Sequence, residues 1–216
     1  MGGKNLSNIS IAVVRRLPKY HRYLKDLLDK EVYRISSKEL GKLIGFTASQ
    51  IRQDLNCFGG FGQQGYGYNV EELYKEISRI LGLNKNYNII IIGAGNLGQA
   101  IANYTGFGKL GFELLALFDI DPRLIGMKIK GIPVLNMDKL DEFISEHGVD
   151  IAIVCAPKDF AQEITDKLNK KNVRGIWNFA PADLNVAEGI IVENVNLSES
   201  LLTLSYLLNE KELLSG

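Results

Sequence analysis

Three glycines and one aspartate are the residues whose spacing best suits a chemical role. Gly93, Gly95 and Gly98 stand in the run IIIIGAGNLGQAIANY, and Asp119 follows 21 residues after the last glycine. In a strand–turn–helix unit, the first such glycine permits a tight turn, the second lets the backbone approach a pyrophosphate, and the third lets the helix pack closely on the strand. An aspartate ending the next strand accepts hydrogen bonds from ribose hydroxyls and repels a 2′-phosphate. The spacing therefore predicts a dinucleotide site that favours NAD(H) over NADP(H).

Residues that follow the other predicted strands are candidates for the same site, because ligands of open parallel sheets lie at the carboxyl ends of strands. Phe179 suggests an apolar seat, and Asn178 offers an amide. Three alternatives remain: the turn is rich in glycine but binds no ligand, or the ligand is FAD, or it is coenzyme A. Pro157 and Pro181 could equally serve only to end strands. The predicted site comprises Gly93, Ala94, Gly95, Asn96, Leu97, Gly98, Asp119, Ile120, Asp121, Cys155, Ala156, Pro157, Asn178, Phe179 and Ala180.

No residue in the sequence is placed to act as an acid or base beside such a cofactor. The two histidines are His21, in the basic N-terminal segment, and His147, at a predicted helix end. No tyrosine is followed four residues later by a lysine. Cys57 and Cys155 have neither metal-ligand nor disulfide spacing, and buried packing is favoured over the alternative that they are reactive thiols. The sequence therefore predicts binding without catalysis and without a metal, with a small NAD-dependent oxidoreductase as the alternative.

The elements that would position this site follow from the hydrophobic pattern after residue 88. Strands are expected at 89–92, 112–118, 132–135, 150–155, 174–178 and 190–193, with helices at 138–147 and 159–170. This alternation predicts a parallel sheet covered by helices. Near the end, Leu197, Leu201, Leu204 and Leu208 form an apolar stripe after Asn196, a predicted N-cap. That stripe must cover its own domain or a second subunit.

The first part of the chain is basic, although the net charge of the whole is zero. Residues 1–56 carry 11 Lys and Arg against 5 Asp and Glu, which suggests a polyanionic partner. A helix is expected from residue 11 to about residue 30, and Pro18 must kink it or lie near its first turn. The glycine–aromatic run at 58–68 predicts a hairpin wing, and an amphipathic helix follows from Val70 to Ile80.

Between these segments the sequence predicts a helix-turn-helix. Ser36 with Glu39, and Thr47 with Gln50, fit capping boxes on either side of Gly45. In the second helix we expect the apolar residues Ile51 and Leu55 to point inward. The outward residues are then Ser49, Gln50, Arg52 and Gln53, for DNA contact or, alternatively, as a solvated face.

Together these segments resemble the Rex family of redox-sensing transcriptional repressors. The resemblance spans nearly the whole chain and is carried by RRLPKYHRYL, ISSKELGKLIGFTASQIRQDL, FGGFGQQGYGY, IIIIGAGNLGQAIANYTGFG, ALFDID, GIWNFAP and VENVNLSESL. It implies a homodimer that binds a palindromic, inverted-repeat operator in double-stranded DNA and releases it when NADH binds. NADH and NAD⁺ are then regulatory ligands.

The resemblance also implies roles for individual residues. The terminal helix would be swapped onto the partner, Tyr104 and Arg16 would couple cofactor to DNA domain, and Leu197 would approach the partner's nicotinamide pocket. Gln53 and the pair Gln63–Gln64 stand where the family usually has basic residues, which weakens the expected phosphate contacts. Cys57 replaces a common aromatic, and Asn196–Leu197 stands where some members have Asp-Phe. The predicted DNA contacts are Arg15, Arg16, Lys19, Ser36, Ser37, Thr47, Ser49, Gln50, Arg52, Gln53, Gln63, Gln64 and Tyr66.

The expected fold is therefore an α/β chain in three parts. Residues 1–84 form a winged helix-turn-helix domain, residues 85–195 a Rossmann-like parallel-sheet domain, and residues 196–216 a swapped dimerisation helix. Apolar runs such as Ile89 to Ile92 are far too short to span a membrane, and the N-terminal residues lack a signal-peptide pattern. The cytoplasm is the expected compartment.

Overall fold

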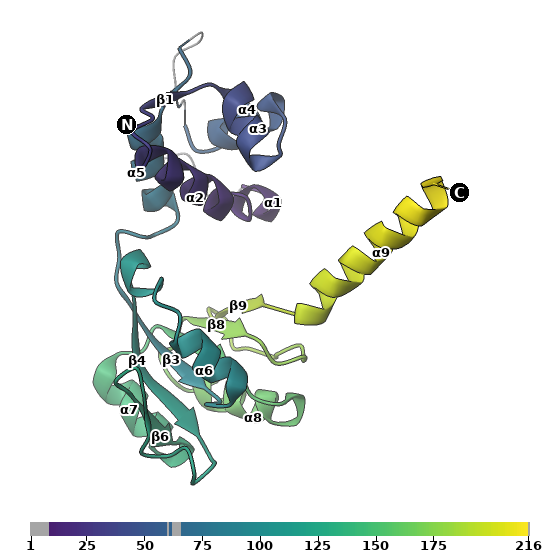
Figure 1. Ribbon diagram of the computed structural model, residues 1–216. Helices are drawn as coiled ribbons and strands as arrows, with labels where there is room; N and C mark the ends of the chain where they lie inside the picture. The colour runs from purple at the N-terminus through teal and green to yellow at the C-terminus, as the bar shows by residue number, and fades with distance from the viewer. Residues whose placement is uncertain (1–8, 60, 62–65, 216) are drawn as a thin grey trace. The chain divides into compact units, whose positions relative to one another are not determined.

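The chain divides into two compact units, residues 1–85 and residues 86–216 (Figure 1). The computed structural model describes residues 9–59, 61 and 66–215. Across these ranges no helix is both long and apolar enough to cross a bilayer.

The first unit is a helical domain with a small antiparallel ribbon. Its elements are α1 (Ile11–Val14), α2 (Leu17–Leu28), β1 (Arg34–Ile35), α3 (Ser37–Ile44), α4 (Ala48–Asn56), β2 (Tyr68–Asn69) and α5 (Val70–Ile80). Strands β1 and β2 pair antiparallel. The core contains apolar side chains from α2, α3, α4, α5 and the two strands. Those fully buried include Leu17, Tyr20, Leu24, Leu40, Ile51 and Ile77.

Local sequence explains the predicted helix-turn-helix. Ser36 and Glu39 form both halves of a capping box at the start of α3. Gly45 ends α3 in the left-handed region at φ 77°, where glycine carries no steric penalty. A Cβ at Gly41 would lie 2.5 Å from the Phe46 carbonyl oxygen, so only glycine lets the turn pass this close to α3.

The structure corrects two expectations in this unit. The single helix expected from residue 11 to about 30 is two helices, and Pro18 lies in the first turn of α2, where a missing N–H costs nothing. The second capping box is only half formed. Thr47 accepts a hydrogen bond from the Gln50 backbone, but the Gln50 side chain turns to Asp54 instead.

The hairpin expected within 58–68 is not formed by the described residues of that run. Tyr68 in β2 pairs instead with Ile35 in β1, 33 positions earlier. Gln63 and Gln64 lie outside the described residues.

The second unit is built on a mostly parallel sheet with the order β5–β6–β4–β3–β7–β8–β9. The strands are β3 (Tyr87–Ile92), β4 (Phe112–Asp119), β5 (Lys128–Ile129), β6 (Ile132–Asn136), β7 (Ile151–Val154), β8 (Gly175–Asn178) and β9 (Ile191–Asn194). Only β5 pairs antiparallel. The six predicted strands are therefore confirmed to within two residues, and β5 was missed because it has only two residues.

Helices cover the two faces of this sheet unequally. On one face, α7 (Leu140–His147) and α8 (Lys158–Asn169) pack on the side chains of Ile90 and Ile92. On the other face, α6 (Asn96–Ala102) lies near Ile89 and Ile91 of β3, and the short 3-10 turn η2 (Gly108–Leu110) lies near Ile89. There an apolar hollow of about 290 Å³ is lined by Ile89, Phe107, Leu110, Phe112, Ile151, Ile153 and Trp177.

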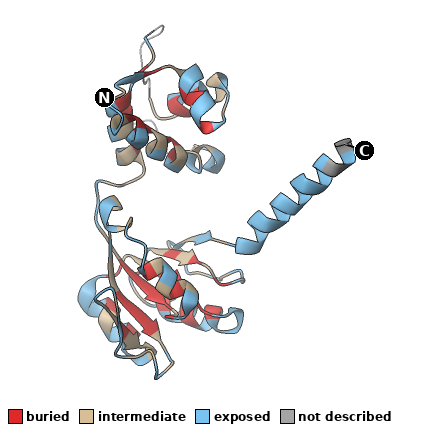
Figure 2. Cartoon of the chain, in the orientation of Figure 1, coloured by how far each residue is buried: buried red, intermediate tan, exposed pale blue. Residues whose placement is uncertain are grey.

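The last helix, α9 (Leu197–Ser215), is exposed from Leu197 to Lys211 (Figure 2). The predicted stripe of leucines is present, but it is not the only apolar surface. Leu202, Tyr206 and Leu213 lie about half a turn away from Leu197, and they are exposed as well. A helix that is apolar on more than one side has to be buried on more than one side.

Candidate functional site

In the glycine-rich loop, one of the three glycines has open space where a side chain would project. Gly93 has φ 100°, and a Cβ there would lie 2.7 Å from the Cys155 carbonyl oxygen. A Cβ at Gly98 would lie 1.9 Å from the Gly93 carbonyl oxygen. A Cβ at Gly95, in contrast, would meet nothing within 4 Å. Gly93 and Gly98 are thus required by the fold, whereas Gly95 leaves space for a ligand.

The loop leads into α6 without a side-chain cap. Gly95 is the N-cap residue and offers no acceptor to the first-turn N–H groups of the helix. Asn96 is exposed, Leu97 is half-buried, and Ala94 is buried. Free N–H groups at a helix start favour an anion, which suits the phosphates of a nucleotide.

Asp119 is fixed beside this loop by the backbone. Its carboxylate accepts hydrogen bonds from the N–H of Ala94 (2.6 Å), Ile120 (2.8 Å) and Asp121 (2.9 Å). A carboxylate has about four acceptor positions, so capacity remains for a hydroxyl group. Asp121 instead pairs with Arg123, whose hydrogen bonds lower the pKa of Asp121 to about 2.

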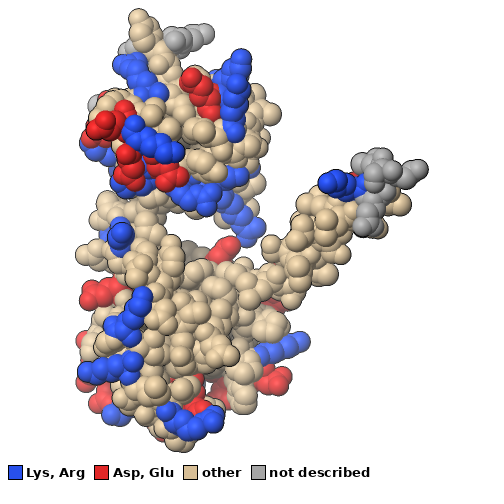
Figure 3. Space-filling view, viewed as in Figure 1, with Lys and Arg blue, Asp and Glu red and all other residues tan. Residues whose placement is uncertain are grey.

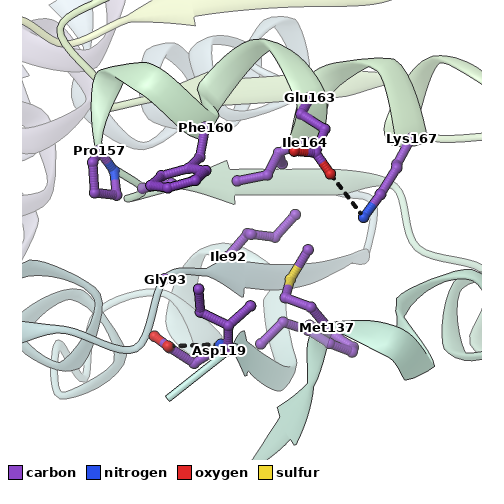
Figure 4. Close-up of a pocket in the computed structure, with 12 residues that line it drawn as sticks. Ile92, Gly93, Asp119, Met137, Pro157, Phe160, Glu163, Ile164 and Lys167 are labelled. Carbon is purple, nitrogen blue, oxygen red and sulfur yellow. Dashed lines mark hydrogen bonds and ion pairs between the residues drawn. The ribbon is translucent and has the colours of Figure 1, made fainter.

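An apolar cavity of about 250 Å³ lies next to Asp119, between the sheet and α8 (Figure 4). Phe160 and Ile164 project into it from α8, and a Glu163–Lys167 ion pair of 3.4 Å closes one end. An apolar slot beside a carboxylate with a free acceptor position has the chemistry to hold a purine nucleoside. The lining residues are Ile92, Gly93, Phe118, Asp119, Ile120, Met137, Ala156, Pro157, Phe160, Glu163, Ile164 and Lys167.

Sequence reasoning missed the α8 and Met137 side of this cavity. It named Ile120, Ala156 and Pro157, but not Phe160 or Ile164. The available signal was the four-residue spacing of these last two, which places both on one face of a helix that follows Pro157.

The residues predicted after β7 and β8 also meet at the carboxyl ends of the strands. The Cys155 N–H donates to the Ile92 carbonyl oxygen, and the Phe179 N–H donates to that of Val154. Burial raises the pKa of the Cys155 thiol to about 12, so the thiol is uncharged at neutral pH.

Asn178 was expected to offer a free amide, and it does not. It is buried, its Nδ2 donates to the Ala182 carbonyl oxygen and to Asn194 Oδ1, and its Oδ1 accepts from the Ala180 N–H. Both N–H groups are therefore used within the chain. Its observed contacts join β8 to β9 and to the loop that follows.

A line of aromatic rings joins Phe179 to Tyr104. Ring centroids are 4.7 Å apart for Phe179–Trp177, 6.0 Å for Trp177–Phe107 and 4.9 Å for Phe107–Tyr104. Tyr104 follows α6 and is 59% exposed, and Leu197 at the start of α9 is 67% exposed. Neither residue lines the cavity beside Asp119.

Neither histidine lines the cavity beside Asp119. His21 stacks on Tyr74 in the first unit, and His147 stacks on Phe143 at the end of α7. Within the ranges the structure describes, no three His, Cys, Asp or Glu side chains are grouped as metal ligands would be.

The candidate DNA-binding surface is centred on α4. Ile51 and Leu55 are buried, as predicted, and Ser49, Arg52 and Gln53 are exposed. Arg52 Nη1 donates to the Ser37 hydroxyl at 3.0 Å, which ties α4 to the start of α3. Gln50 was expected to point fully outward, but it is half-buried because its amide donates to Asp54.

A lysine of α2 lies beside this helix pair. Lys19 Nζ lies 4.8 Å from the centre of the Phe46 ring, in the turn between α3 and α4. Arg15 is exposed at the end of α1, and Tyr66 is exposed just before β2. Figure 3 shows lysines and arginines spread over the visible face of this unit, with acidic groups among them.

Two residues in this part of the first unit were not predicted. Arg34, on β1, lies 5.9 Å from the Tyr66 ring centre and adds a cation near the expected wing. Asp54, on α4, is completely buried and holds Arg16 by two hydrogen bonds of 2.6 and 2.7 Å. Arg16 is thus engaged inside the first unit.

Comparisons with known proteins agree with this division. Residues 8–56 match the family described as putative DNA-binding protein N-terminus, and residues 84–182 match the CoA binding domain family. The redox-sensing transcriptional repressor Rex of Clostridioides difficile (strain 630) is 65% identical over 203 residues, which are 94% of this chain and 97% of that protein. The Rex protein of Clostridium tetani is 64% identical over 205 residues, 95% of this chain and 97% of that one.

Two solved structures of a protein called RSP resemble the whole chain. One, in complex with β-NAD⁺ and operator DNA, is 60% identical with a TM-score of 0.90 and covers 96% of this chain and 95% of its own. The other, in complex with β-NADH, is 57% identical with a TM-score of 0.89 and covers 96% of this chain and 98% of its own.

Proposed function

Because the chain belongs to the Rex family of redox-sensing transcriptional repressors, we propose that it binds an inverted-repeat operator as a homodimer and releases it when NADH binds. Residues 1–84 contact DNA, residues 85–195 hold the nucleotide, and residues 196–216 join the two copies. The observation that carries this proposal is the match along 96% of the chain to RSP, which has been crystallised with both NAD⁺ and operator DNA.

The geometry of the second unit supports NAD(H) rather than coenzyme A as the ligand. The open side of Gly95 admits a pyrophosphate, and Asp119 presents a carboxylate to the adenosine ribose. Coenzyme A carries a phosphate on that ribose, as NADP does, and a neighbouring carboxylate repels it. The adenine ring occupies the cavity lined by Phe160 and Ile164.

The proposed redox preference follows from the charge of the nicotinamide ring. The oxidised ring is a cation and the reduced ring is neutral, so an apolar seat penalises NAD⁺ more than NADH. Phe179 and Trp177 supply apolar surface beside the strand ends, and Leu197 of a second copy adds to it. A ligand shifts the dimer between two shapes only by its difference in affinity for them.

The exposed terminal helix supports the homodimer. Apolar side chains of α9 are half to three-quarters exposed in a single chain, and the sheet face around Trp177 has an apolar hollow. Placing α9 of one copy on the second copy would bury both surfaces and give the closed, symmetric contact of a twofold dimer.

The nucleotide is proposed to be sensed and not consumed. Neither histidine lies at the nucleotide site, and the Cys155 thiol remains protonated at neutral pH. Dehydrogenation requires a group that transfers a proton beside the nicotinamide. The relatives are named as regulators, in agreement with this proposal.

The test is a gel-shift titration on an inverted-repeat duplex selected from random DNA by the protein. NADH should release the duplex at concentrations where NAD⁺ does not, and coenzyme A should have no effect. Equal release by NADH and NAD⁺ would contradict the charge argument. Steady oxidation of NADH with a carbonyl substrate, together with no DNA binding, would show that the chain is an oxidoreductase and not a repressor.

A further inference from the structure

A buried carboxylate lies on the helix proposed to read DNA. Asp54, on α4, is 0% exposed, and both of its side-chain oxygens are fully hydrogen-bonded. A charge buried without partners is strongly unfavourable. This one has four donors, which matches the acceptor capacity of a carboxylate.

The donors come from three different places in the first unit. Arg16, between α1 and α2, donates through Nε (2.6 Å) and Nη2 (2.7 Å). Tyr20, on α2, donates its hydroxyl to Oδ2 at 2.7 Å, and Gln50, one turn earlier on α4, donates Nε2 to Oδ1 at 2.8 Å. Burial acts to raise the pKa of Asp54, but these hydrogen bonds outweigh it and keep the pKa below its usual value.

The bond to Gln50 determines how that side chain presents its amide. A carboxylate can only accept hydrogen bonds, so the NH₂ end of Gln50 must face Asp54. One N–H is used there, and the second N–H and the carbonyl oxygen remain available. Gln50 lies in the first turn of α4, and in helix-turn-helix proteins the first residues of the recognition helix meet the base edges.

We propose that Asp54 is a positioning residue for operator recognition, which orients Gln50 so that its amide reads an adenine. In that arrangement the Gln50 carbonyl oxygen accepts from adenine N6 and its remaining N–H donates to N7. Asp54 itself does not touch DNA. The inference rests on the proposed function, since it requires that α4 enters the major groove.

A purely structural role for Asp54 predicts a different result. If Asp54 only joined α4 to α2 through Arg16 and Tyr20, its loss would weaken binding to every duplex equally. If it orients Gln50, its loss removes the preference at one base pair of each half-site. The base preference therefore separates the two roles, whereas affinity alone does not.

The experiment uses the full-length protein and a set of operator duplexes in which each base pair is replaced in turn. Gln50→Ala, Asp54→Asn, Tyr20→Phe and the double variant Gln50→Ala/Asp54→Asn are compared with the wild type. Tyr20→Phe is the matched control, because it removes one donor to Asp54 and leaves the Gln50 bond in place. Thermal unfolding and NADH titration check that both units are folded.

Gln50→Ala should lose roughly 5- to 150-fold of preference for one A·T pair, the range expected for one bidentate contact. Asp54→Asn should lose preference at the same pair, and it should cause no further loss in the Gln50→Ala background. Tyr20→Phe should keep the wild-type preference. Unchanged preference in Asp54→Asn, or a loss spread over all base pairs, overturns the inference while leaving the proposed function intact.

A measurement on the wild-type protein covers the case in which Asp54→Asn does not fold. The side-chain NH₂ signals of Gln50, assigned by their absence in Gln50→Ala, should show slowed hydrogen exchange and restricted motion by NMR. Signals as mobile as those of a free glutamine overturn the inference. A wild-type protein that binds no duplex overturns both the inference and the proposed function.

Discussion

Replacing Gly95 by alanine tests whether a pyrophosphate crosses the glycine-rich loop. The new Cβ meets nothing within 4 Å, and the residue has φ −70° and ψ −169°, which alanine adopts without strain. Alanine is the weaker N-cap, but it also loses less conformational entropy on folding than glycine. These effects oppose each other, so we expect the unfolding free energy to change by less than about 1 kcal/mol.

The cost should appear only when the nucleotide binds. A phosphate oxygen must come within about 2.7–3.2 Å of a backbone nitrogen to accept its hydrogen bond. The alanine methyl group stands in this approach, and a displacement of ~1 Å breaks the bond. A hydrogen bond to a charged group contributes about 1.5–3 kcal/mol, so the affinity for NADH should fall roughly 10- to 150-fold.

Gly98→Ala is the matched control for this prediction. Its Cβ would lie 1.9 Å from the Gly93 carbonyl oxygen, so the loop or α6 must move even without ligand. Such overpacking costs about 1–3 kcal/mol and should lower the melting temperature of the nucleotide-free protein. Fluorescence titration with NADH and thermal unfolding, applied to both variants, separate the two effects. Wild-type NADH affinity in Gly95→Ala would show that no pyrophosphate lies over Gly95.

Three further predictions follow from other parts of the structure. Arg52→Ala should lower operator affinity at least tenfold in a gel shift while NADH still binds. If a phosphate contact is lost, the slope of log K, the operator association constant, against log salt concentration should flatten by about 0.9. Lys75→Ala, on α5, is the control, and an equal loss of affinity there would contradict the assignment of α4 as the DNA-contacting helix. The hydrogen bonds of Asp54 lower its pKa on folding, so its contribution to stability is complete above its ordinary pKa of about 3.9 and declines as the pH falls below that value. The difference in unfolding free energy between wild type and Asp54→Asn should therefore be constant from pH 7 to about pH 5, and a decline across that window would contradict the assignment. In Cys57→Ser, the remaining thiol at Cys155 should react with a disulfide reagent at pH 8 only after unfolding in urea, because burial raises its pKa to about 12; rapid reaction of the folded protein would exclude this.

Features that depend on local sequence were predicted well. The glycine at the end of α3, the capping box of Ser36 and the strand positions each follow from residues within a few positions of one another. The distinct roles of the three glycines are a partial exception. Their spacing indicates the loop, but only the structure shows that Gly95 alone faces open space.

Features that depend on distant residues could not be read from the sequence. Arg16 and Asp54 are 38 positions apart, and nothing in either segment indicates that they pair. The same is true of Asn178, whose amide is used by Asn194 across the β8–β9 pair. A sequence gives the capacity of a side chain for hydrogen bonds, whereas the partner that uses this capacity is fixed by tertiary packing.

The two-sided apolar character of α9 links assembly to thermal stability. No single flat surface can shield a helix with Leu197 and Leu201 on one side and Leu202 and Tyr206 on the other. In the proposed homodimer each copy would therefore enclose the terminal helix of its neighbour, and unfolding of one copy would expose the apolar surface of the other. By mass action, the midpoint of thermal denaturation should rise with protein concentration, and dilution alone should predispose the protein to aggregation.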